Sequence, residues 1–202
     1  SFVDQDLANT GHTATVTGVS ASGSTGGILP GFFGTIELMS FFHVDNVVKI
    51  DKDIPLDRAA LVSCGVMTGV GAVVNTARVE PGSVTVVFGA GGVGLNAIQG
   101  CVIAGAAMIV AVDMSDAKLE MAKQFGATHV LNAKTEENVV KALRKLTGGG
   151  ADYAFECVGY GEIAAQAYGV LRKGGTAVVV GVASQKDTTT LRTASLTFEE
   201  KT

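Results

Sequence analysis

The segment VTVVFGAGGVGLNAIQG, residues 84–100, constrains the fold of this chain more than any other feature. Its first five residues form a largely apolar run, which is typical of a strand covered on both faces of a sheet. Gly89, Gly91 and Gly94 follow in G-x-G-x-x-G spacing. In this pattern the first glycine permits a tight turn, the second lets a pyrophosphate approach the backbone, and the third lets the helix pack on the strand. The segment therefore predicts a strand, a turn and a helix whose first N–H groups bind a phosphate.

A second apolar run, MIVAVD, ends at Asp113. This residue lies about twenty residues after the last glycine, where a carboxylate can accept hydrogen bonds from the ribose hydroxyls of an adenosine. The same charge would repel a 2′-phosphate, which favours NAD over NADP. An alternative role for Asp113 is a cap at the end of its strand, before the helix that begins near Ser115. The strand, the three glycines and the acidic residue at 113 together favour a dinucleotide-binding site over a simple cap.

Apolar runs and helical patterns alternate from Pro81 onward. This order of elements predicts right-handed crossovers and an α/β fold with a doubly wound parallel sheet, a Rossmann fold. The expected strands are Val84–Phe88, Met108–Val112, His129–Leu131, Tyr153–Cys157 and Ala177–Val182.

Helix faces and caps are predicted between these strands. We expect Ser115 and Thr135 each to open a helix, and the three glycines at 148–150 to end the second one. Two apolar faces follow from helical spacing: Leu95, Ile98 and Val102, and Val139, Leu143 and Leu146.

The chain before the sheet has a different character. Residues 55–79 are expected to form one or two helices interrupted by glycine, and residues 1–33 a loop or poorly packed β-structure. We expect residues 1–50 to contain this segment and a remnant of a β-rich domain, and residues 51–202 to form a nucleotide-binding domain. The first residue is Ser1 and the sequence ends at TFEEKT, so we expect an excised or truncated polypeptide.

Composition narrows the class of protein. Hydrophobic residues make up 47% of the chain and the net charge is −4, which argues for a globular protein and against a nucleic-acid partner. The odd count of three cysteines predicts free thiols and a cytoplasmic location. We expect no membrane span, because no uninterrupted apolar run of about eighteen residues is evident. His12, His43 and His129 are too scattered to form a metal site.

Several longer stretches carry a family resemblance. They include LVSCGVMTGVGAVVNTARVEPGSVTVVFGAGGVGLNAIQGC, GAAMIVAVDMSDAKLEMAKQFGATHVLNA, GGGADYAFECVG and GGTAVVVGV. In their order and spacing they resemble the coenzyme-binding half of the zinc-dependent medium-chain alcohol dehydrogenases, in the branch of the liver-type and glutathione-dependent formaldehyde dehydrogenases. The resemblance covers roughly residues 34–202 and implies NAD and zinc as cofactors of the intact enzyme.

The resemblance also implies roles for individual residues. Cys64 would be a ligand of a catalytic zinc, which lowers the pKa of a bound alcohol before hydride transfer. Thr68, Val93 and Val182 would pack against the nicotinamide ring, although small apolar side chains in such places are by default core residues. Cys101 and Cys157 are expected to be structural. The expected cofactor-binding residues are Gly89, Gly91, Gly92, Val93, Gly94, Asp113, Lys118, Thr68, Val158, Gly181 and Val182.

Parts of the family pattern are missing from this sequence. The family pairs its cysteine with a second cysteine and a histidine from a preceding domain, and it carries a four-cysteine lobe for a structural zinc. We therefore expect no tight catalytic zinc in one copy of this chain. We also expect the sixth strand to be missing, which would leave Ala177–Val182 as an apolar sheet edge open to pairing with a second copy.

These observations lead to one principal hypothesis and two alternatives. The principal one is the NAD-binding portion of an alcohol dehydrogenase that acts on an alcohol or a hydroxymethyl adduct, with the chain alone inactive. The first alternative is a stand-alone NAD-binding or sensing module without chemistry. The second is a metal-free quinone or enoyl reductase, which would prefer NADPH. Asp113 and Cys64 argue against the second.

Overall fold

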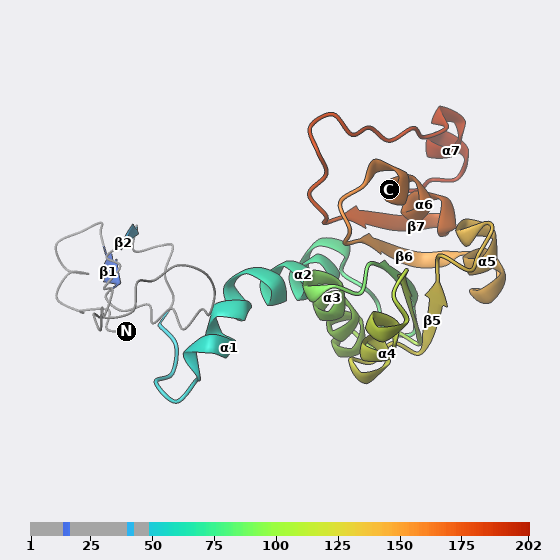
Figure 1. Ribbon diagram of the computed structural model, residues 1–202. Coiled ribbons are helices and arrows are strands. Elements are labelled where there is room, and N and C mark those ends of the chain that lie inside the picture. The colour runs from blue at the N-terminus through green and yellow to red at the C-terminus, as the bar shows by residue number, and fades with distance from the viewer. Residues whose placement is uncertain (1–13, 17–39, 43–48) are drawn as a thin grey trace, which may run out of the picture. The chain divides into compact units, whose positions relative to one another are not determined.

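The computed structural model describes residues 14–16, 40–42 and 49–202 of the chain (Figure 1). The chain divides into two compact units, Ser1–Pro55 and Leu56–Thr202. In the first unit, strand β1 (Ala14–Val16) pairs antiparallel with β2 (Ser40–Phe42). The expected loop at residues 1–33 otherwise lies outside the described residues, as do His12 and His43.

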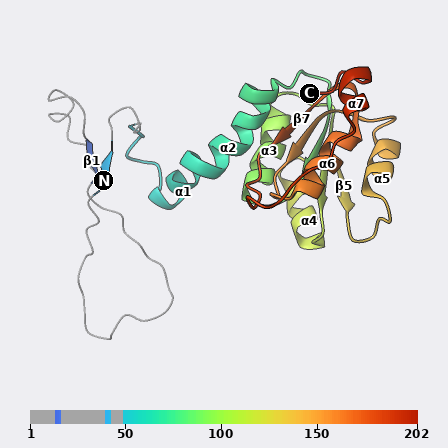
Figure 2. The ribbon, with the colours of Figure 1, turned by 90° about the horizontal axis from the view of Figure 1, so that it is seen from above.

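The second unit begins with one continuous helical stretch, Leu56–Ala77 (Figure 2). It consists of α1 (Leu56–Leu61), the π-helical segment η3 (Val62–Val66), α2 (Met67–Gly71) and the π-helical segment η4 (Ala72–Ala77). The prediction that glycines interrupt this stretch was wrong. One of these glycines, Gly69, serves close packing instead, since a Cβ on it would lie 2.5 Å from the carbonyl oxygen of Val93 in the next helix. The helix ends where Arg78 adopts a left-handed conformation, with φ of 51°.

This stretch also qualifies the expectation of no membrane span. By length and composition alone it could cross a membrane, with 22 residues and a mean hydropathy of 1.5. The sequence prediction overlooked it because polar residues such as Ser63, Thr68 and Asn75 interrupt its apolar run. A single helix of this kind is weak evidence for a membrane protein, because the core helix of a soluble protein can have the same length and composition.

The remaining elements form a parallel five-stranded sheet with helices on both faces. Its strand order is β5-β4-β3-β6-β7, which confirms the doubly wound α/β fold. The elements are β3 (Val84–Phe88), α3 (Gly92–Ile103), β4 (Met108–Asp113), α4 (Asp116–Gln124), β5 (His129–Asn132), α5 (Val139–Leu146), β6 (Ala151–Glu156), α6 (Gly161–Val170), β7 (Leu171–Val179) and α7 (Thr193–Phe198).

Alternate side chains of the strands enter two separate apolar layers. On one face, Val87 and Phe155 pack with α3, α4 and the end of the first helical stretch. On the other face, Val86 and Phe88 pack with α5 and α6. Both faces of β3 are therefore buried, as its apolar sequence predicted. The one hydroxyl in this strand, on Thr85, donates a hydrogen bond to the carbonyl oxygen of Met108 (3.1 Å).

Three local predictions need correction. Thr135 does not cap a helix, because its hydroxyl donates back to the carbonyl oxygen of Asn132 (2.9 Å). Helix α5 begins after Asn138, whose side chain accepts a hydrogen bond from the N–H of Lys141 (2.9 Å). Val102 is about half exposed rather than buried with Leu95 and Ile98, because it lies in the last turn of α3. Leu146 is similarly exposed at the end of α5, whereas Leu143 is fully buried.

Strands β6 and β7 also differ from their predicted bounds. Strand β6 starts two residues before Tyr153 and ends at Glu156. Strand β7 starts at Leu171 and contains an irregularity, since Ala151 pairs with Leu171 but Tyr153 pairs with Thr176. Glycines in this part of β7 weakened the strand pattern that the prediction relied on.

Strand β7 lies at the edge of the sheet, but part of this edge is paired with the last residues of the chain. The N–H of Thr202 donates to the carbonyl oxygen of Gly175 (3.0 Å), and the N–H of Ala177 donates to the carbonyl oxygen of Thr202 (2.7 Å). The edge expected at Ala177–Val182 is therefore covered at its first residue. Beyond it, Val179 and Val182 are exposed.

Candidate functional site

The glycine turn connects β3 to α3 as the sequence predicted. Gly89 has φ of 91°, a conformation that side chains rarely adopt, and Gly91 is the extended N-cap of α3. A Cβ on Gly94 would overlap the carbonyl oxygen of Gly89, so the helix packs directly on the turn. Added Cβ atoms on Gly91 and Gly92 would meet no atom within 4 Å. The turn thus combines close packing at Gly94 with open space beside Gly91 and Gly92 at the amino end of α3, where a helix favours an anion.

Asp113 lies beside this turn at the end of β4. One of its carboxylate oxygens accepts a hydrogen bond from the N–H of Ala90 (2.9 Å), and the other accepts one from the N–H of Ser115 (3.0 Å). The Lys118 ammonium lies 3.8 Å from the first of these oxygens. Asp113 therefore does cap its strand end locally. A carboxylate offers about four acceptor positions, so it can still accept a hydrogen bond from a ligand hydroxyl.

The sheet order reverses direction between β3 and β6, beside the glycine turn. In a doubly wound sheet this switch point opens a crevice at the carboxyl ends of the strands, where ligands bind. The glycine turn contacts the loop after β6 here. Val158 lies directly against Gly89, since a Cβ atom added to Gly89 would lie only 2.8 Å from Cγ2 of Val158. That loop in turn meets the end of β7, since a Cβ on Gly159 would lie 2.6 Å from the carbonyl oxygen of Val182. Val158, Gly181 and Val182 are thus brought to the glycine turn.

Residues of the first helical stretch reach the same turn. Gly69 packs against the first turn of α3 at the carbonyl oxygen of Val93, and Thr68 precedes it in α2. Thr68 is exposed and Val93 is partly exposed. The structure therefore brings Asp113 and Val158 to the glycine turn, and Gly181 and Val182 to the neighbouring loop after β6. The cofactor-binding roles of these residues and of Thr68 stay predictions.

Sequence reasoning missed one residue of this region, Glu156. It is the last residue of β6 and is fully buried. Its Oε1 atom accepts hydrogen bonds from the N–H groups of Val158 and Gly159 (both 2.7 Å). Its Oε2 atom has no hydrogen-bond partner. The signal in the sequence was a single charged residue within the apolar run YAFEC, since an ionisable group is seldom buried without a specific reason.

Cys64 lies in η3 and is exposed. Across the described part of the chain, no group of three or more histidine, cysteine or acidic residues comes together in a way that could hold a metal ion. Zinc requires three or four such ligands, so the residues described do not by themselves form a zinc site.

Of the other two cysteines, Cys101 is buried and Cys157 is partly buried. Burial raises the pKa of Cys101 to about 11, against a smaller opposing effect of its hydrogen bond with Thr85. Burial, together with the nearby Glu156 and Cys101, raises the pKa of Cys157 to about 12. Both thiols are therefore almost entirely protonated near neutral pH, and their structural role stays a prediction.

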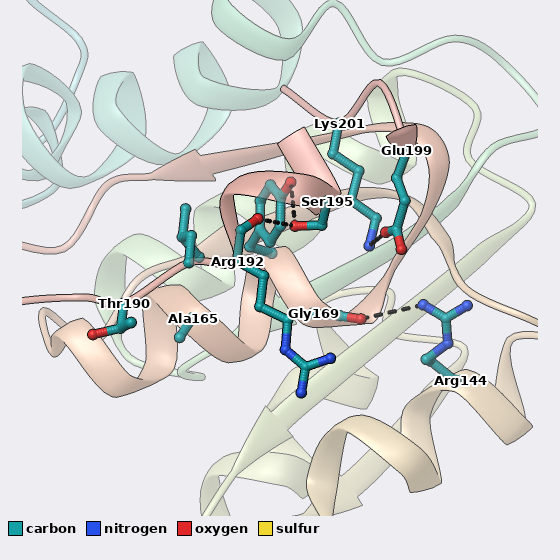
Figure 3. Close-up of a pocket in the computed structure, with 10 residues that line it drawn as sticks. Arg144, Ala165, Gly169, Thr190, Arg192, Ser195, Glu199 and Lys201 are labelled. Atoms are coloured by element: carbon teal, nitrogen blue, oxygen red, sulfur yellow. Dashed lines mark hydrogen bonds and ion pairs between the residues drawn. The ribbon is translucent and has the colours of Figure 1, made fainter. Parts of the chain in front are cut away.

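A separate cavity of about 390 Å³ lies between α5, α6 and the chain after residue 189 (Figure 3). Arg144 lines it and donates hydrogen bonds to the carbonyl oxygens of Gly169 (3.3 Å) in α6 and Leu171 (2.9 Å) at the start of β7. Lys201 forms an ion pair with Glu199 (2.5 Å). None of the predicted site residues lines this cavity, so the candidate site remains the glycine turn.

Comparison with protein families gives one match in sequence. A family described as "Zinc-binding dehydrogenase" matches residues 92–202, which is more than half of the chain. The chain is also 46% identical over 144 residues to S-(hydroxymethyl)glutathione dehydrogenase from Paracoccus denitrificans, covering 68% of this chain and 38% of that protein. It is 44% identical over 157 residues to alcohol dehydrogenase class-3 from Pisum sativum, covering 76% of this chain and 42% of that protein.

Solved structures share the same fold. Benzyl alcohol dehydrogenase from Acinetobacter calcoaceticus superposes with a TM-score of 0.77 at 38% identity, covering 82% of this chain and 45% of that one. The chain thus spans about two fifths of the length of the curated relatives it matches.

Proposed function

The chain belongs to the zinc-binding dehydrogenase family, and from that premise we propose that residues 51–202 are the NAD-binding domain of an alcohol dehydrogenase. The parent enzyme would transfer hydride reversibly between an alcohol, or a hydroxymethyl adduct, and NAD. Residues 1–50 would belong to a different domain. The names of the relatives from P. denitrificans and P. sativum support this substrate class.

The observation that carries the proposal is the open space at Gly91 and Gly92, in front of the amino end of α3. A pyrophosphate there would accept hydrogen bonds from the first N–H groups of α3, with the helix dipole favouring its negative charge. Asp113 lies at the β4 side of this space and Val158 at the β6 side. This arrangement supports an extended dinucleotide with its adenosine toward Asp113 and its nicotinamide toward Val158.

Different side chains would then contact the two ends of the dinucleotide. Asp113 would accept from the adenosine ribose hydroxyls and repel a 2′-phosphate, with Lys118 beside it. Val93, Val182 and Thr68 would contact the two faces of the nicotinamide. NAD itself supplies the hydride acceptor, while this domain binds and orients it.

Cys64 would contribute one zinc ligand, and the others would have to come from outside the described residues. The free thiols support the expected cytoplasmic location. The exposed Val179 and Val182 near the edge of β7 support association into a homodimer, which light scattering of the purified chain would test.

Titration of the chain with NADH and NADPH, followed by nicotinamide fluorescence, tests the proposal. We expect saturable NADH binding and at least about tenfold weaker NADPH binding, a difference near 1.4 kcal/mol. A matched variant, Gly91→Ala, should keep the fold and lose affinity, because its methyl group enters open space. Failure of the unaltered chain to bind either nucleotide would refute the proposal.

The same titration separates the two alternative functions. A metal-free quinone or enoyl reductase would prefer NADPH, whereas a stand-alone NAD-binding module would bind NADH like the proposed domain. The module is excluded if the native reading frame encodes a catalytic domain on the same chain.

A further inference from the structure

Glu156 is a buried acid at the junction of two loops that the proposed site requires. Through Oε1 it holds the N–H groups of Val158 and Gly159, in the loop after β6. Through its backbone carbonyl oxygen it accepts hydrogen bonds from the N–H groups of Val180 (2.8 Å) and Gly181 (3.0 Å), at the end of β7. One residue therefore connects both strand ends that border the crevice on this side.

The fit around the carboxylate is tight. A Cβ on Gly181 would lie 2.7 Å from Oε2 of Glu156 and 2.6 Å from Cα of Gly159. Glycine at 181 thus lets the end of β7 close directly over the carboxylate. The loop after β6 is held from the other side, where Val158 contacts the glycine turn at Gly89.

The buried carboxylate of Glu156 lowers the stability of the folded domain. Oε2 is the one buried side-chain oxygen or nitrogen in the described residues that has no hydrogen-bond partner. A buried carboxylate with an unsatisfied oxygen destabilises a core, and an apolar side chain of similar volume would pack there without that cost. Such a local conflict with stability is expected where a residue serves a site.

We propose that Glu156 is a positioning residue that sets the nicotinamide end of the cofactor site, an inference that rests on the proposed function. It acts through the backbone of the loop after β6. By fixing Val158 and Gly159 against the glycine turn, and the end of β7 over them, it shapes the surface on which the nicotinamide would lie. The adenosine end, held by Asp113 and the turn, does not depend on it.

The test compares two ligands by calorimetry on the 202-residue chain. NADH carries the nicotinamide ring, whereas ADP-ribose has the same pyrophosphate and riboses but lacks that ring. In Glu156→Ala we expect the dissociation constant for NADH to rise at least about tenfold and that for ADP-ribose to change less than about threefold. Glu156→Gln should restore NADH binding, because its amide oxygen can accept from both N–H groups. Glu162→Ala, which removes an exposed glutamate in α6, is the control and should match the unaltered chain.

Amide hydrogen exchange provides a second measurement that needs no ligand. In Glu156→Ala the N–H groups of Val158 and Gly159 should lose protection, whereas those of Val180 and Gly181 should keep it because their acceptor is the backbone. If the alanine variant does not fold, Glu156→Asp replaces it, since its shorter side chain cannot reach both N–H groups. It should show the same selective losses to a smaller degree.

The outcomes separate this inference from the proposed function. Equal loss of NADH and ADP-ribose affinity, or unchanged affinity and exchange in Glu156→Ala, would overturn the positioning role alone. Absence of NADH binding in the unaltered chain would overturn the proposed function and this role with it. Selective loss of NADH affinity with exposed Val158 and Gly159 amides would support both.

Discussion

Replacement of Gly94 by alanine tests how closely α3 must pack on the glycine turn. The added Cβ would overlap the carbonyl oxygen of Gly89 and lie 2.8 Å from its carbonyl carbon. Both are backbone atoms, so no side chain can rotate to relieve the overlap. Either the turn or the first turn of α3 has to move.

The magnitude follows from two opposing effects. Overpacking of this kind costs about 1–3 kcal/mol and more when backbone must shift. Alanine in a helix gains at most about 1 kcal/mol over glycine. We therefore expect Gly94→Ala to lower the free energy of unfolding by about 2 kcal/mol, which corresponds to a fall in Tm of about 4–8 °C for a domain of this size.

The matched control is Gly92→Ala, the same substitution two residues earlier in the same helix. Its Cβ meets no atom within 4 Å, so this variant should be as stable as the unaltered chain or slightly more stable. Urea unfolding followed by circular dichroism measures both variants. Equal stability of the Gly94→Ala and Gly92→Ala variants would refute the packing argument.

Three further predictions concern charge and thiols. Asp113→Asn should weaken NADH binding and raise the ratio of NADPH affinity to NADH affinity at least about tenfold, because it removes the charge that repels a 2′-phosphate. An unchanged ratio in parallel titrations with the two nucleotides would contradict the role of Asp113. At pH 8 a thiol reagent should modify exposed Cys64 faster than buried Cys101 and partly buried Cys157, whose raised pKa values keep them protonated. Equally rapid modification of all three thiols would contradict this reasoning. The thiols of Cys101 and Cys157 ionise near pH 9.0 in the unfolded chain but only near 11 and 12 in the folded one, so the free energy of unfolding should fall as the pH rises above about 9. Urea unfolding at several pH values measures this fall.

The parts of the fold that the sequence predicted well depend on local rules. The strand Val84–Phe88, the turn at Gly89 and the helix that follows are each determined by residues within a few positions of one another. Their apolar runs and glycine spacing were therefore sufficient. The order of strands and helices was enough for the doubly wound sheet, because crossover handedness leaves few alternatives.

The parts that were missed depend on contacts between distant segments. The continuous helix Leu56–Ala77 is explained by the packing of Gly69 on α3, which no local pattern reveals. Strand β7 pairs with β6 at Leu171 and again from Thr176, on either side of a glycine-containing stretch that no local pattern assigns to a strand. Glu156 gains its role only when the loops after β6 and β7 come together around it.

The most direct test of the account is to map NADH on the chain by amide chemical shifts in a ¹⁵N-labelled sample. The account predicts shifts at Gly91 and Gly92, at the residue after Asp113, and at Val158 and Gly159, with none around Arg144 in the separate cavity. Saturable shifts confined to that cavity, or no shifts at the glycine turn, would contradict the claim that this crevice holds the dinucleotide.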